Sequence, residues 1–435
     1  MLAALFVFGV VGGAGADTLR RFFVLAGIAP LVACSPSTLR RTLGTMVHAL
    51  GDWGDATGKA LGDAVRAGPE RLLSLALDET WKRSMILVAM DVASGFILAE
   101  AHATARDAAT WSATMTKALG ALPVKVVQAV ADEAKGIAAY VAAQVGVHRG
   151  SDLFHGLYEL GPVLRALHAK HAEVEAAPST GSERTNALRR LRHRIEIVRE
   201  GMGALSDTMH PFNLRTGARV EPTAMRAAME QWLARIRYAA SESGLSASAR
   251  ARIGKVLRLV PTWVESLAWW QRFEATQRAA LALPAALDAV VGEVLVPWAY
   301  LSRCRERATS AAERAALKVA LEALSARLSS SSAWSSVTST EQHSLREWAS
   351  WVASHFVRAS SCVEGRNGAL SLRYHHRRAL PPAVLKALTV VHNYGLRRPD
   401  GTTAAERLFG LRHADPFEHL VEVITPLPLP RRRAA

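Results

Sequence analysis

Short apolar runs separated by turn and helix signals lie between residues 71 and 131, and they constrain the fold more than any other feature. LLSLALD and VKVVQAV each predict one strand, and MILVAMDVASGFILAEAH predicts two strands around a turn at Ala93-Ser94-Gly95. ARDAATWSATMTKALGAL, which Pro123 ends, and KGIAAYVAAQVGV have helical periodicity. The predicted order is therefore β-β-β-α-β-α, which indicates an α/β domain.

A long stretch without strand signals follows, from about Leu160 to Ser344. It is rich in Ala, Arg and Leu and has helical periodicity. A segment of this size is too long for a loop, so we expect an all-helical subdomain inserted into the α/β domain. Its helices should break near Pro178–Gly181, Pro211, Pro222 and Pro284, and a polar loop at Ser329–Ser336 should lead out of it.

Three acidic motifs flank this insertion. Asp78 ends the run LALD, Asp132 lies where VVQAVA runs out, and Glu364 lies in the helical pattern SSCVEGRNGALS, with Asn367 and Ser371 on the same helical face. Carboxylates that are remote in sequence but converge in space form sites for two hard cations. Such a site cuts or joins phosphodiesters, because one metal activates the attacking oxygen and the other stabilises the leaving oxygen.

Each acid also has a simpler interpretation. Asp78 is then a loop residue after a strand, Asp132 a helix N-cap, and Glu364 a solvent-exposed glutamate. Asp91 is a rival first acid, but Asp91-Val-Ala-Ser-Gly leads into a hairpin turn, where Asp is favoured for local reasons. We prefer Asp78, because the three acids together lie in suitable elements and in a suitable order.

The charge balance favours a polyanionic partner. The 435 residues include 53 Lys and Arg against 38 Asp and Glu, which gives a net charge of +15 and a pI near 10.3. Each neutralised phosphate releases counterions, so this excess favours DNA, although a basic protein without such a partner is the simpler alternative. The arginines expected to contact DNA are Arg40, Arg41, Arg366, Arg373, Arg377 and Arg378.

Cysteine usage and the N-terminus bear on location. Cys34, Cys304 and Cys362 include no CxxC motif and no zinc spacing, so we expect a cytoplasmic, nucleoid-associated protein. MLAALFVFGVVGGAGA resembles a signal peptide, but it has no basic residue before the apolar run and is too short to span a bilayer. We expect a buried helix there and no membrane partner. Cleavage after about Ala16 would instead indicate an exported helical protein.

Residues 1–66 predict short helices. Ser35 is a good N-cap and precedes a proline, and Arg40 and Arg41 follow in the first turns of the next helix. Two helices joined by a tight turn match a helix-turn-helix, although any small helical hairpin has the same pattern. The Gly- and Asp-rich segment 51–68 predicts a linker with loose helix at most.

The chain resembles bacterial insertion-sequence DDE transposases, whose catalytic domain has the ribonuclease H-like fold. The layout, with a helical insertion before the last acid, is similar to hobo-type and mutator-like elements. The resemblance covers residues 70–160 and 345–435. The similar stretches are DETW, AMDVASGFILAE, ADEAKG, GVHRGSDLFHGLYEL, SCVEGRNGALSLRYHHR and RPDGTTAAERLFG. The domains expected are an N-terminal helical region (1–66), the first part of the catalytic domain (70–160), the insertion (161–345), its last part (346–422) and a basic Pro/Arg tail (423–435).

The resemblance implies roles for particular residues. Asp78, Asp132 and Glu364 would bind two Mg²⁺ or Mn²⁺ ions. Asp152-Leu-Phe-His155 is similar to a C/D-x-x-H motif of such transposases, so His155 would position the scissile phosphate; its simpler interpretation is a histidine at the edge of a core. An enzyme that holds two DNA ends would be a dimer or larger. Family members usually have a longer N-terminal DNA-binding region, so recognition of the element ends is in doubt here.

Further alternatives stay open. Trp263, Trp269 and Trp270 would stack on a base flipped out beside the cleavage point, or, more usually for such a cluster, form helical core. Arg189–Arg194 and Arg431–Arg433 are further basic tracts that either contact DNA or are solvated. A non-catalytic protein derived from a transposase and a structure-specific nuclease of the same fold are the rival functions.

Overall fold

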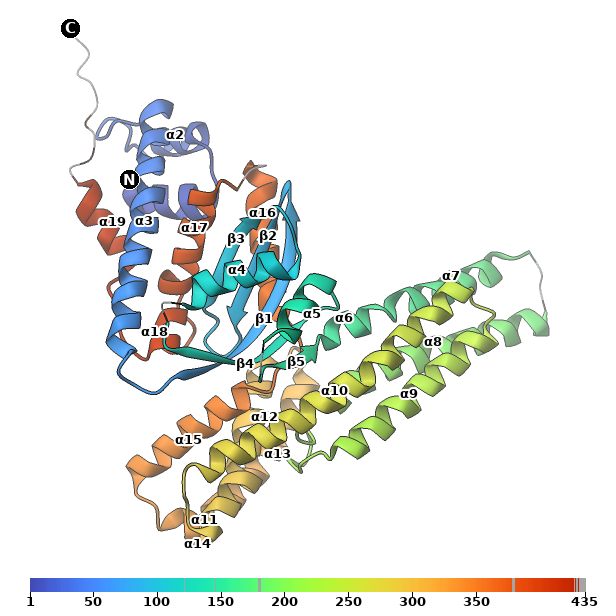
Figure 1. Ribbon diagram of the computed structural model, residues 1–435. Helices are drawn as coiled ribbons and strands as arrows, with labels where there is room; N and C mark the ends of the chain where they lie inside the picture. The colour runs from blue at the N-terminus through green and yellow to red at the C-terminus, as the bar shows by residue number, and fades with distance from the viewer. Residues whose placement is uncertain are drawn as a thin grey trace. The chain divides into compact units, whose positions relative to one another are not determined.

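The computed structural model describes residues 1–120, 122–144, 146–178, 181–377, 380–425, 427 and 429. The chain divides into two compact units, Met1–Val147 with Ser360–Ala435, and His148–Ala359 (Figure 1). We call them the sheet unit and the helical unit. The helical unit is wider than the predicted insertion, 161–345. The predicted α/β class is confirmed, because helices accompany one mixed sheet of five strands.

The sheet has the strand order β3-β2-β1-β4-β5. β1 pairs with β2 and β2 with β3 in antiparallel fashion, whereas β1 and β4 are parallel. The turn between β1 and β2 is tight, with Arg83 at a φ of 62°. The strands are β1 (Arg71–Lys82), β2 (Ser84–Asp91), β3 (Ile97–Ala103), β4 (Val124–Ala131) and β5 (His148–Ser151).

Alternation along the strands gives the sheet two different faces. Leu75 and Leu77 of β1 belong to a large core with Trp111 of α4 (Ala108–Leu119). Ala76 lies on the other face, in a smaller core with Ile86 and Val88 of β2 and with Val363 and Leu370 of α16 (Ser361–Arg377). α16 therefore covers the face of β1 on which the side chain of residue 78 also falls.

The remaining helices of the sheet unit pack mainly around α3 (Pro36–Val65), which contacts α2, η1, α17 and α19. The apolar N-terminus forms the expected buried helix, with Leu2, Leu5 and Val10 in the core. The other elements are α1 (Leu2–Ala4), the π-helical η1 (Leu5–Val11), α2 (Ala16–Leu25), α5 (Lys135–Ala142), α17 (Pro382–Val390), the π-helical η3 (Val391–Gly395), α18 (Ala404–Phe409) and α19 (Pro416–Ile424).

Two predictions for the N-terminal region are wrong. The segment 51–65, predicted as a loose linker, is the second half of the 30-residue helix α3. The turn of a helix-turn-helix has about three or four residues, whereas residues 26–35 connect α2 to α3. Ser35 does cap α3 as predicted, accepting a hydrogen bond from the Thr38 amide at 3.2 Å. Residues 1–66 belong to the core of the sheet unit and do not form a separate domain.

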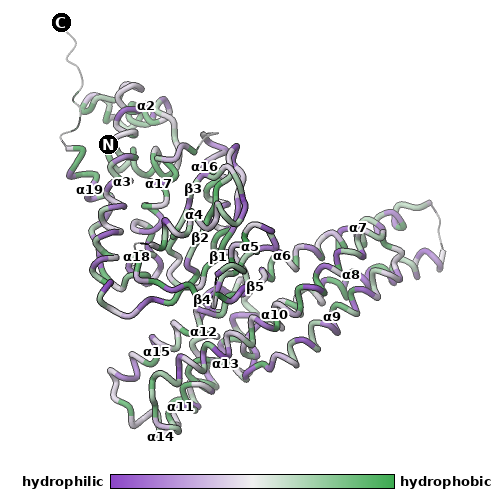
Figure 2. Tube along the Cα trace, in the orientation of Figure 1, coloured by the Kyte–Doolittle hydropathy of each residue, from purple (hydrophilic) through white to green (hydrophobic). Residues whose placement is uncertain are grey.

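The helical unit consists of β5, which the sequence does not predict, and a series of helices, which it does. Its helix breaks fall near residues 178, 211, 222 and 284, as predicted. Hydrophobic and hydrophilic residues alternate along α8 and α9 (Figure 2), so each helix buries one stripe. The helices are α6 (Leu153–Tyr158), α7 (Gly161–Ala176), α8 (Ser182–Thr208), α9 (Pro222–Glu242), α10 (Ala247–Ala279), α11 (Ala285–Val290), the π-helical η2 (Val291–Leu295), α12 (Val296–Arg307), α13 (Ala311–Ser329), α14 (Ser332–Ser335) and α15 (Ser339–Ser354).

The tryptophans of α10 are mostly core. Trp263 and Trp270 are fully buried, and the Trp270 indole donates to the Val352 carbonyl at 3.1 Å. Trp269 is half-buried and stacks on His148, with ring centroids 4.9 Å apart. The core interpretation of Trp263 and Trp270 is therefore the right one.

Residues 285–307 are the one helical stretch, within the part of the chain that the structure describes, long and apolar enough to cross a membrane. More than half of its most apolar window is buried inside the protein. A helix that is apolar on most sides and buried is typical of a protein core.

Candidate functional site

The register of the sheet places Asp78 beside Asp132. β1 and β4 run parallel, and their last paired residues are Ala76 and Val130. Asp78 follows Ala76 by two residues on β1, so its side chain falls on the same face as that of Ala76, and Asp132 is the residue directly after β4, two residues beyond Val130. The register thus brings the backbone at Asp132 level with that at Asp78, where the pairing of β1 with β4 ends, and Asp78 lies on the face that α16 covers.

α16 is tied to this face through polar side chains. Asn367 Nδ2 donates to Asp78 Oδ2 at 2.7 Å, and Lys82 Nζ donates to Ser371 Oγ. The two β1 residues, Asp78 and Lys82, are four positions apart, and so are their partners on α16, Asn367 and Ser371. The helix therefore runs in the same direction as the strand along this face. Glu364 lies one turn before Asn367 on the same helical face, which carries it toward the part of β1 that precedes Asp78.

Backbone amides orient both aspartates. The Glu79 amide donates to Asp78 Oδ1 at 2.8 Å, and the Ala134 amide donates to Asp132 Oδ1 at 2.9 Å. The ligand oxygens of Asp78, Asp132 and Glu364 do not all lie within 4.8 Å of one another. The donors are hard oxygens, the type that Mg²⁺ and Mn²⁺ prefer.

Asp91, the rival first acid, lies on the opposite face. It pairs with Leu75, whose side chain belongs to the large core. Its carboxylate accepts hydrogen bonds from the Ser94 amide at 2.8 Å and the Ser94 hydroxyl at 2.6 Å, as expected for the first residue of a turn. Burial raises the pKa of Asp91 above its usual range. Asp91 therefore stabilises the turn between β2 and β3 and cannot join Asp132.

Two of the predicted DNA-contacting arginines are buried, so that prediction is wrong for them. Arg366 Nε and Nη2 donate to the two oxygens of Glu100 at 2.7 and 2.6 Å, and its side chain is 7% exposed. Arg373 Nη1 donates to the Gly9 carbonyl at 3.1 Å, and the side chain is buried against the N-terminal helices. Helical spacing on α16 placed both residues near the acids, but it could not show that they face inward.

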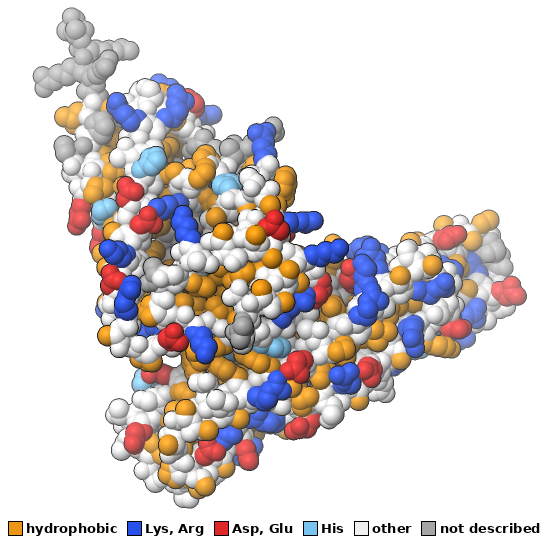
Figure 3. Space-filling model, viewed as in Figure 1, with side chains coloured by type: hydrophobic (Ala, Val, Ile, Leu, Met, Phe, Trp, Pro, Cys, Tyr) orange, Lys and Arg blue, Asp and Glu red, His pale blue; other side chains and the backbone are white. Residues whose placement is uncertain are grey.

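The remaining basic residues stay predictions. Arg40 and Arg41 are exposed in the first turns of α3. The side chain of Arg377, the whole of Arg378 and the tract Arg431–Arg433 lie outside the described residues. On the face drawn in Figure 3, Lys and Arg side chains are interspersed with Asp and Glu rather than gathered in one stripe.

Asp152 and His155 lie in the helical unit, at the start of α6. Asp152 is buried and caps this helix, because its Oδ1 accepts from the Phe154 amide at 2.6 Å and the His155 amide at 3.2 Å. His155 is half-buried. The role of His155 at a phosphate stays a prediction.

Sequence reasoning missed two residues that tie α16 to the sheet. Glu100 of β3 is fully buried and accepts from Thr389 Oγ1 at 2.6 Å as well as from Arg366, so it anchors both α17 and α16 to the sheet. Lys82 holds the far end of α16 through Ser371. Lys82 could have been found, because it lies four residues after Asp78 on an alternating strand and so shares its face.

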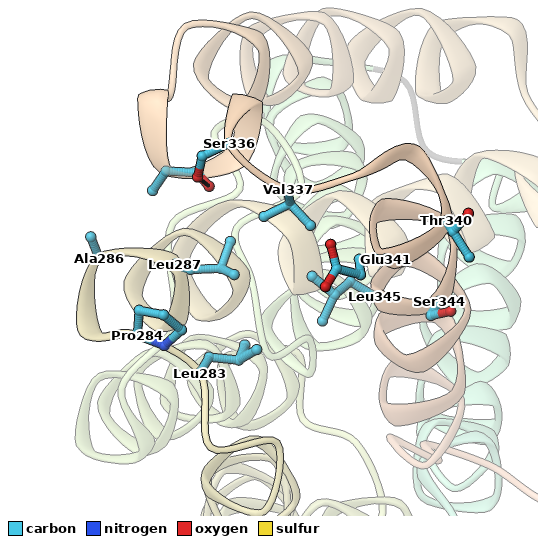
Figure 4. Close-up of a pocket in the computed structure, with 11 residues that line it drawn as sticks. Leu283, Pro284, Ala286, Leu287, Ser336, Val337, Thr340, Glu341, Ser344 and Leu345 are labelled. Carbon is cyan, nitrogen blue, oxygen red and sulfur yellow. Dashed lines mark hydrogen bonds between the residues drawn. The ribbon is translucent and has the colours of Figure 1, made fainter.

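A pocket of about 620 Å³ opens in the helical unit, near the starts of α11 and α15 (Figure 4). Leu283, Leu287, Val337 and Leu345 make most of its wall apolar. Glu341 is the one charged side chain among its described lining residues, and Thr338 holds it in a capping box. The pocket therefore offers no free acid or base for chemistry.

Comparison with known proteins gives one match. Residues 291–435 match a family of unknown function, DUF6399. The matched segment includes α16 with Glu364 and Asn367, but not the strands that carry Asp78 and Asp132. No curated protein and no solved structure matches the chain.

Proposed function

We propose that the protein is a DDE-type DNA transposase whose sheet unit is a ribonuclease H-like catalytic domain. The observation that carries the proposal is the hydrogen bond between Asp78 and α16, the helix that bears Glu364. Asp78 lies on β1 two residues beyond the last pairing with β4, Asp132 directly follows β4, and Asn367 of α16 donates to Asp78 Oδ2 at 2.7 Å. A cluster of oxygen ligands of this kind suits divalent cations that act on phosphodiesters.

The sheet supports the choice of fold. Three antiparallel strands followed by a parallel one, in the order β3-β2-β1-β4-β5, fit the ribonuclease H-like arrangement expected from the sequence. The chain leaves the sheet unit after residue 147 and returns at residue 360, just before Glu364. This agrees with a helical insertion that precedes the last acid.

In this proposal Asp78, Asp132 and Glu364 hold two Mg²⁺ or Mn²⁺ ions. Bound divalent cations supply Lewis acidity to the attacking and leaving oxygens of a phosphodiester. The backbone amides of Glu79 and Ala134 keep the aspartates oriented. Water attack at the element end yields a 3′-hydroxyl and a 5′-phosphate. Attack of that 3′-hydroxyl on a target phosphodiester forms the new bond and releases a 3′-hydroxyl from the target strand, without a protein-bound intermediate.

The test is metal-dependent cleavage of supercoiled plasmid carrying the native flanking DNA. We expect wild type to cut with Mg²⁺ or Mn²⁺ and Asp78→Asn, Asp132→Asn and Glu364→Gln to have lost cleavage while keeping their circular dichroism spectra. Glu79→Gln is the matched control: Glu79 lies next to Asp78 on the opposite face, accepting from the Trp111 indole at 3.1 Å, and Gln keeps an acceptor there.

Three outcomes decide between the alternatives. DNA binding without cutting by wild type would leave a non-catalytic, transposase-derived binding protein. Cutting without joining in a strand-transfer assay would indicate a structure-specific nuclease. Cutting that survives Glu364→Gln would show that Glu364 is not the third acid.

A further inference from the structure

We infer that Asn367 is a positioning residue of the candidate metal centre, holding the Asp78 carboxylate with its amide NH₂ and turning its own oxygen toward the cations. The inference rests on the proposed function. Asn367 is not one of the three acids. Its hydrogen bond to Asp78 could serve only to dock α16 on the sheet, or it could orient the Asp78 carboxylate, and we infer the second role.

The first argument is the way in which Asp78 is held. Both of its oxygens accept a hydrogen bond, Oδ1 from the Glu79 amide at 2.8 Å and Oδ2 from Asn367 Nδ2 at 2.7 Å. One hydrogen bond to each oxygen fixes the plane of the carboxylate. Partners of this kind around metal ligands set the direction in which the ligand oxygens point.

The second argument is the other end of the amide. Asn367 Oδ1 is buried and has no hydrogen-bond partner among the described residues. Exchanging the amide oxygen and nitrogen does not resolve this, because it would bring two acceptors together at Asp78. A buried acceptor without a donor is costly in a fold, and amide oxygens are ligands that hard cations accept. The oxygen is therefore suited to a cation or to a water that a cation holds.

A matched contact on the same helix provides the control. Ser371 lies one turn after Asn367 and accepts from Lys82, so it ties α16 to β1 without touching an acid. If Asn367 merely docks α16, Asn367→Ala and Ser371→Ala should behave alike. If it orients Asp78, the two variants should differ in metal affinity.

The experiment is Mn²⁺ binding to the full chain by isothermal titration calorimetry, without DNA. We expect Asn367→Ala to weaken the affinity by about 10- to 100-fold, as loss of a partner of a metal ligand does. Ser371→Ala should leave the affinity close to wild type. Equal affinities for wild type and Asn367→Ala would overturn the inference while leaving the proposed function standing. Failure of wild type itself to bind Mn²⁺ would overturn both.

Asn367→Asp adds a second measurement, the melting temperature with and without Mn²⁺, whose response to Mn²⁺ would not change if Asn367 only docked α16. The new carboxylate faces Asp78, so with EDTA its melting temperature should fall below that of wild type. Mn²⁺ neutralises the added charge, so saturating Mn²⁺ should raise the melting temperature more in Asn367→Asp than in wild type. A smaller or equal rise would contradict the inferred position of Asn367 beside the cations.

Discussion

Each unit of the protein contains a glutamate whose buried side chain is paired with arginine, but the two pairings differ in the sequence separation of the partners. Glu100 in the sheet unit is bonded by Arg366, which is 266 residues away, and by Thr389. Glu274 in the helical unit is bonded by Arg278, four residues later on the same helix, and by Arg219 at 3.0 Å. The ion pair between Glu100 and Arg366 joins segments that are distant in the sequence, whereas the ion pair between Glu274 and Arg278 lies within α10.

The two glutamates differ in the number of arginines that neutralise them, and this difference identifies a single contact on which the candidate site depends. Glu274 has two arginines, so removing one leaves a charged partner. Glu100 has one, and Arg366 lies two residues after Glu364 on α16. The position of the third acid therefore depends on a buried ion pair that is not itself part of the proposed chemistry. The predictions below test this asymmetry, beginning with the largest effect.

Arg366→Met should have the largest effect on stability. It leaves the Glu100 carboxylate buried with Thr389 as its remaining partner, and breaking a buried ion pair from one side costs about 3–5 kcal/mol. Urea unfolding followed by circular dichroism would measure the loss, and plasmid cleavage should fall with it because α16 loses its anchor. Adding Glu100→Gln should recover part of the stability, since it removes the unpaired charge. No recovery would contradict the ion-pair explanation.

Acid should destabilise the helical unit through its buried histidines. Burial lowers the pKa of His355 to about 3 and that of His148 to about 4. Below pH 6.5 the unfolded chain binds protons that the folded state excludes, so stability is lost as the pH falls from 6.5 toward these values. At about 1.4 kcal/mol per pH unit, His355 alone should contribute a loss of about 2–3 kcal/mol between pH 6.5 and 4.5.

His355→Phe should remove that part of the pH dependence. A phenyl ring suits the site, because His355 packs against Trp351 and Phe273 with centroids 4.8 and 5.0 Å away. His343→Gln is the control, since His343 lies on α15, the helix that ends just before His355, with its side chain 74% exposed. Urea unfolding at pH 6.5 and 4.5 would give the difference. Parallel pH dependences for wild type and His355→Phe would refute the assignment.

Arg219→Met should cost less than Arg366→Met. Glu274 keeps its bond from Arg278 Nε at 2.9 Å, and Arg219 is itself 31% exposed. We expect a loss of about 1.5–3 kcal/mol, the range of a single hydrogen bond to a charged group. The same urea titration measures it, and cleavage per folded molecule should not change. A loss as large as that of Arg366→Met would remove the contrast between the two glutamates.

Local patterns predicted most of the elements. The apolar runs after residue 71 correspond to β1 to β4, because short apolar runs bounded by turn signals are typical of strands buried in a sheet. β5 was not predicted, since its four residues, His148–Ser151, carry no apolar alternation. The acids were placed near strand ends from the same runs, but their mutual arrangement depends on the register between β1 and β4.

Contacts between distant segments explain the errors. Glycines in the segment 51–65 indicated a linker, yet α3 continues through them because α17 approaches closely there. A Cβ at Gly54 would lie 2.3 Å from Val390 Cγ2, and one at Gly51 would lie 3.4 Å from the Lys386 side chain. Likewise, the sequence around Arg366 cannot show that Glu100, on β3, lies opposite it. Pairing over such separations is a property of the fold and not of the local pattern.

The smallest expected effect concerns the arginines that remain exposed. Arg40 and Arg41 face solvent at the start of α3, whereas Arg373 is buried against Gly9. If the first two neutralise DNA phosphates, the double variant Arg40→Ala/Arg41→Ala should reduce the slope of log K against log salt concentration by about 2. Arg373→Met should leave that slope unchanged, because a guanidinium bonded inside the protein releases no counterions. Fluorescence anisotropy over a salt series measures both slopes, and the reverse pattern would place DNA on α16 instead of α3.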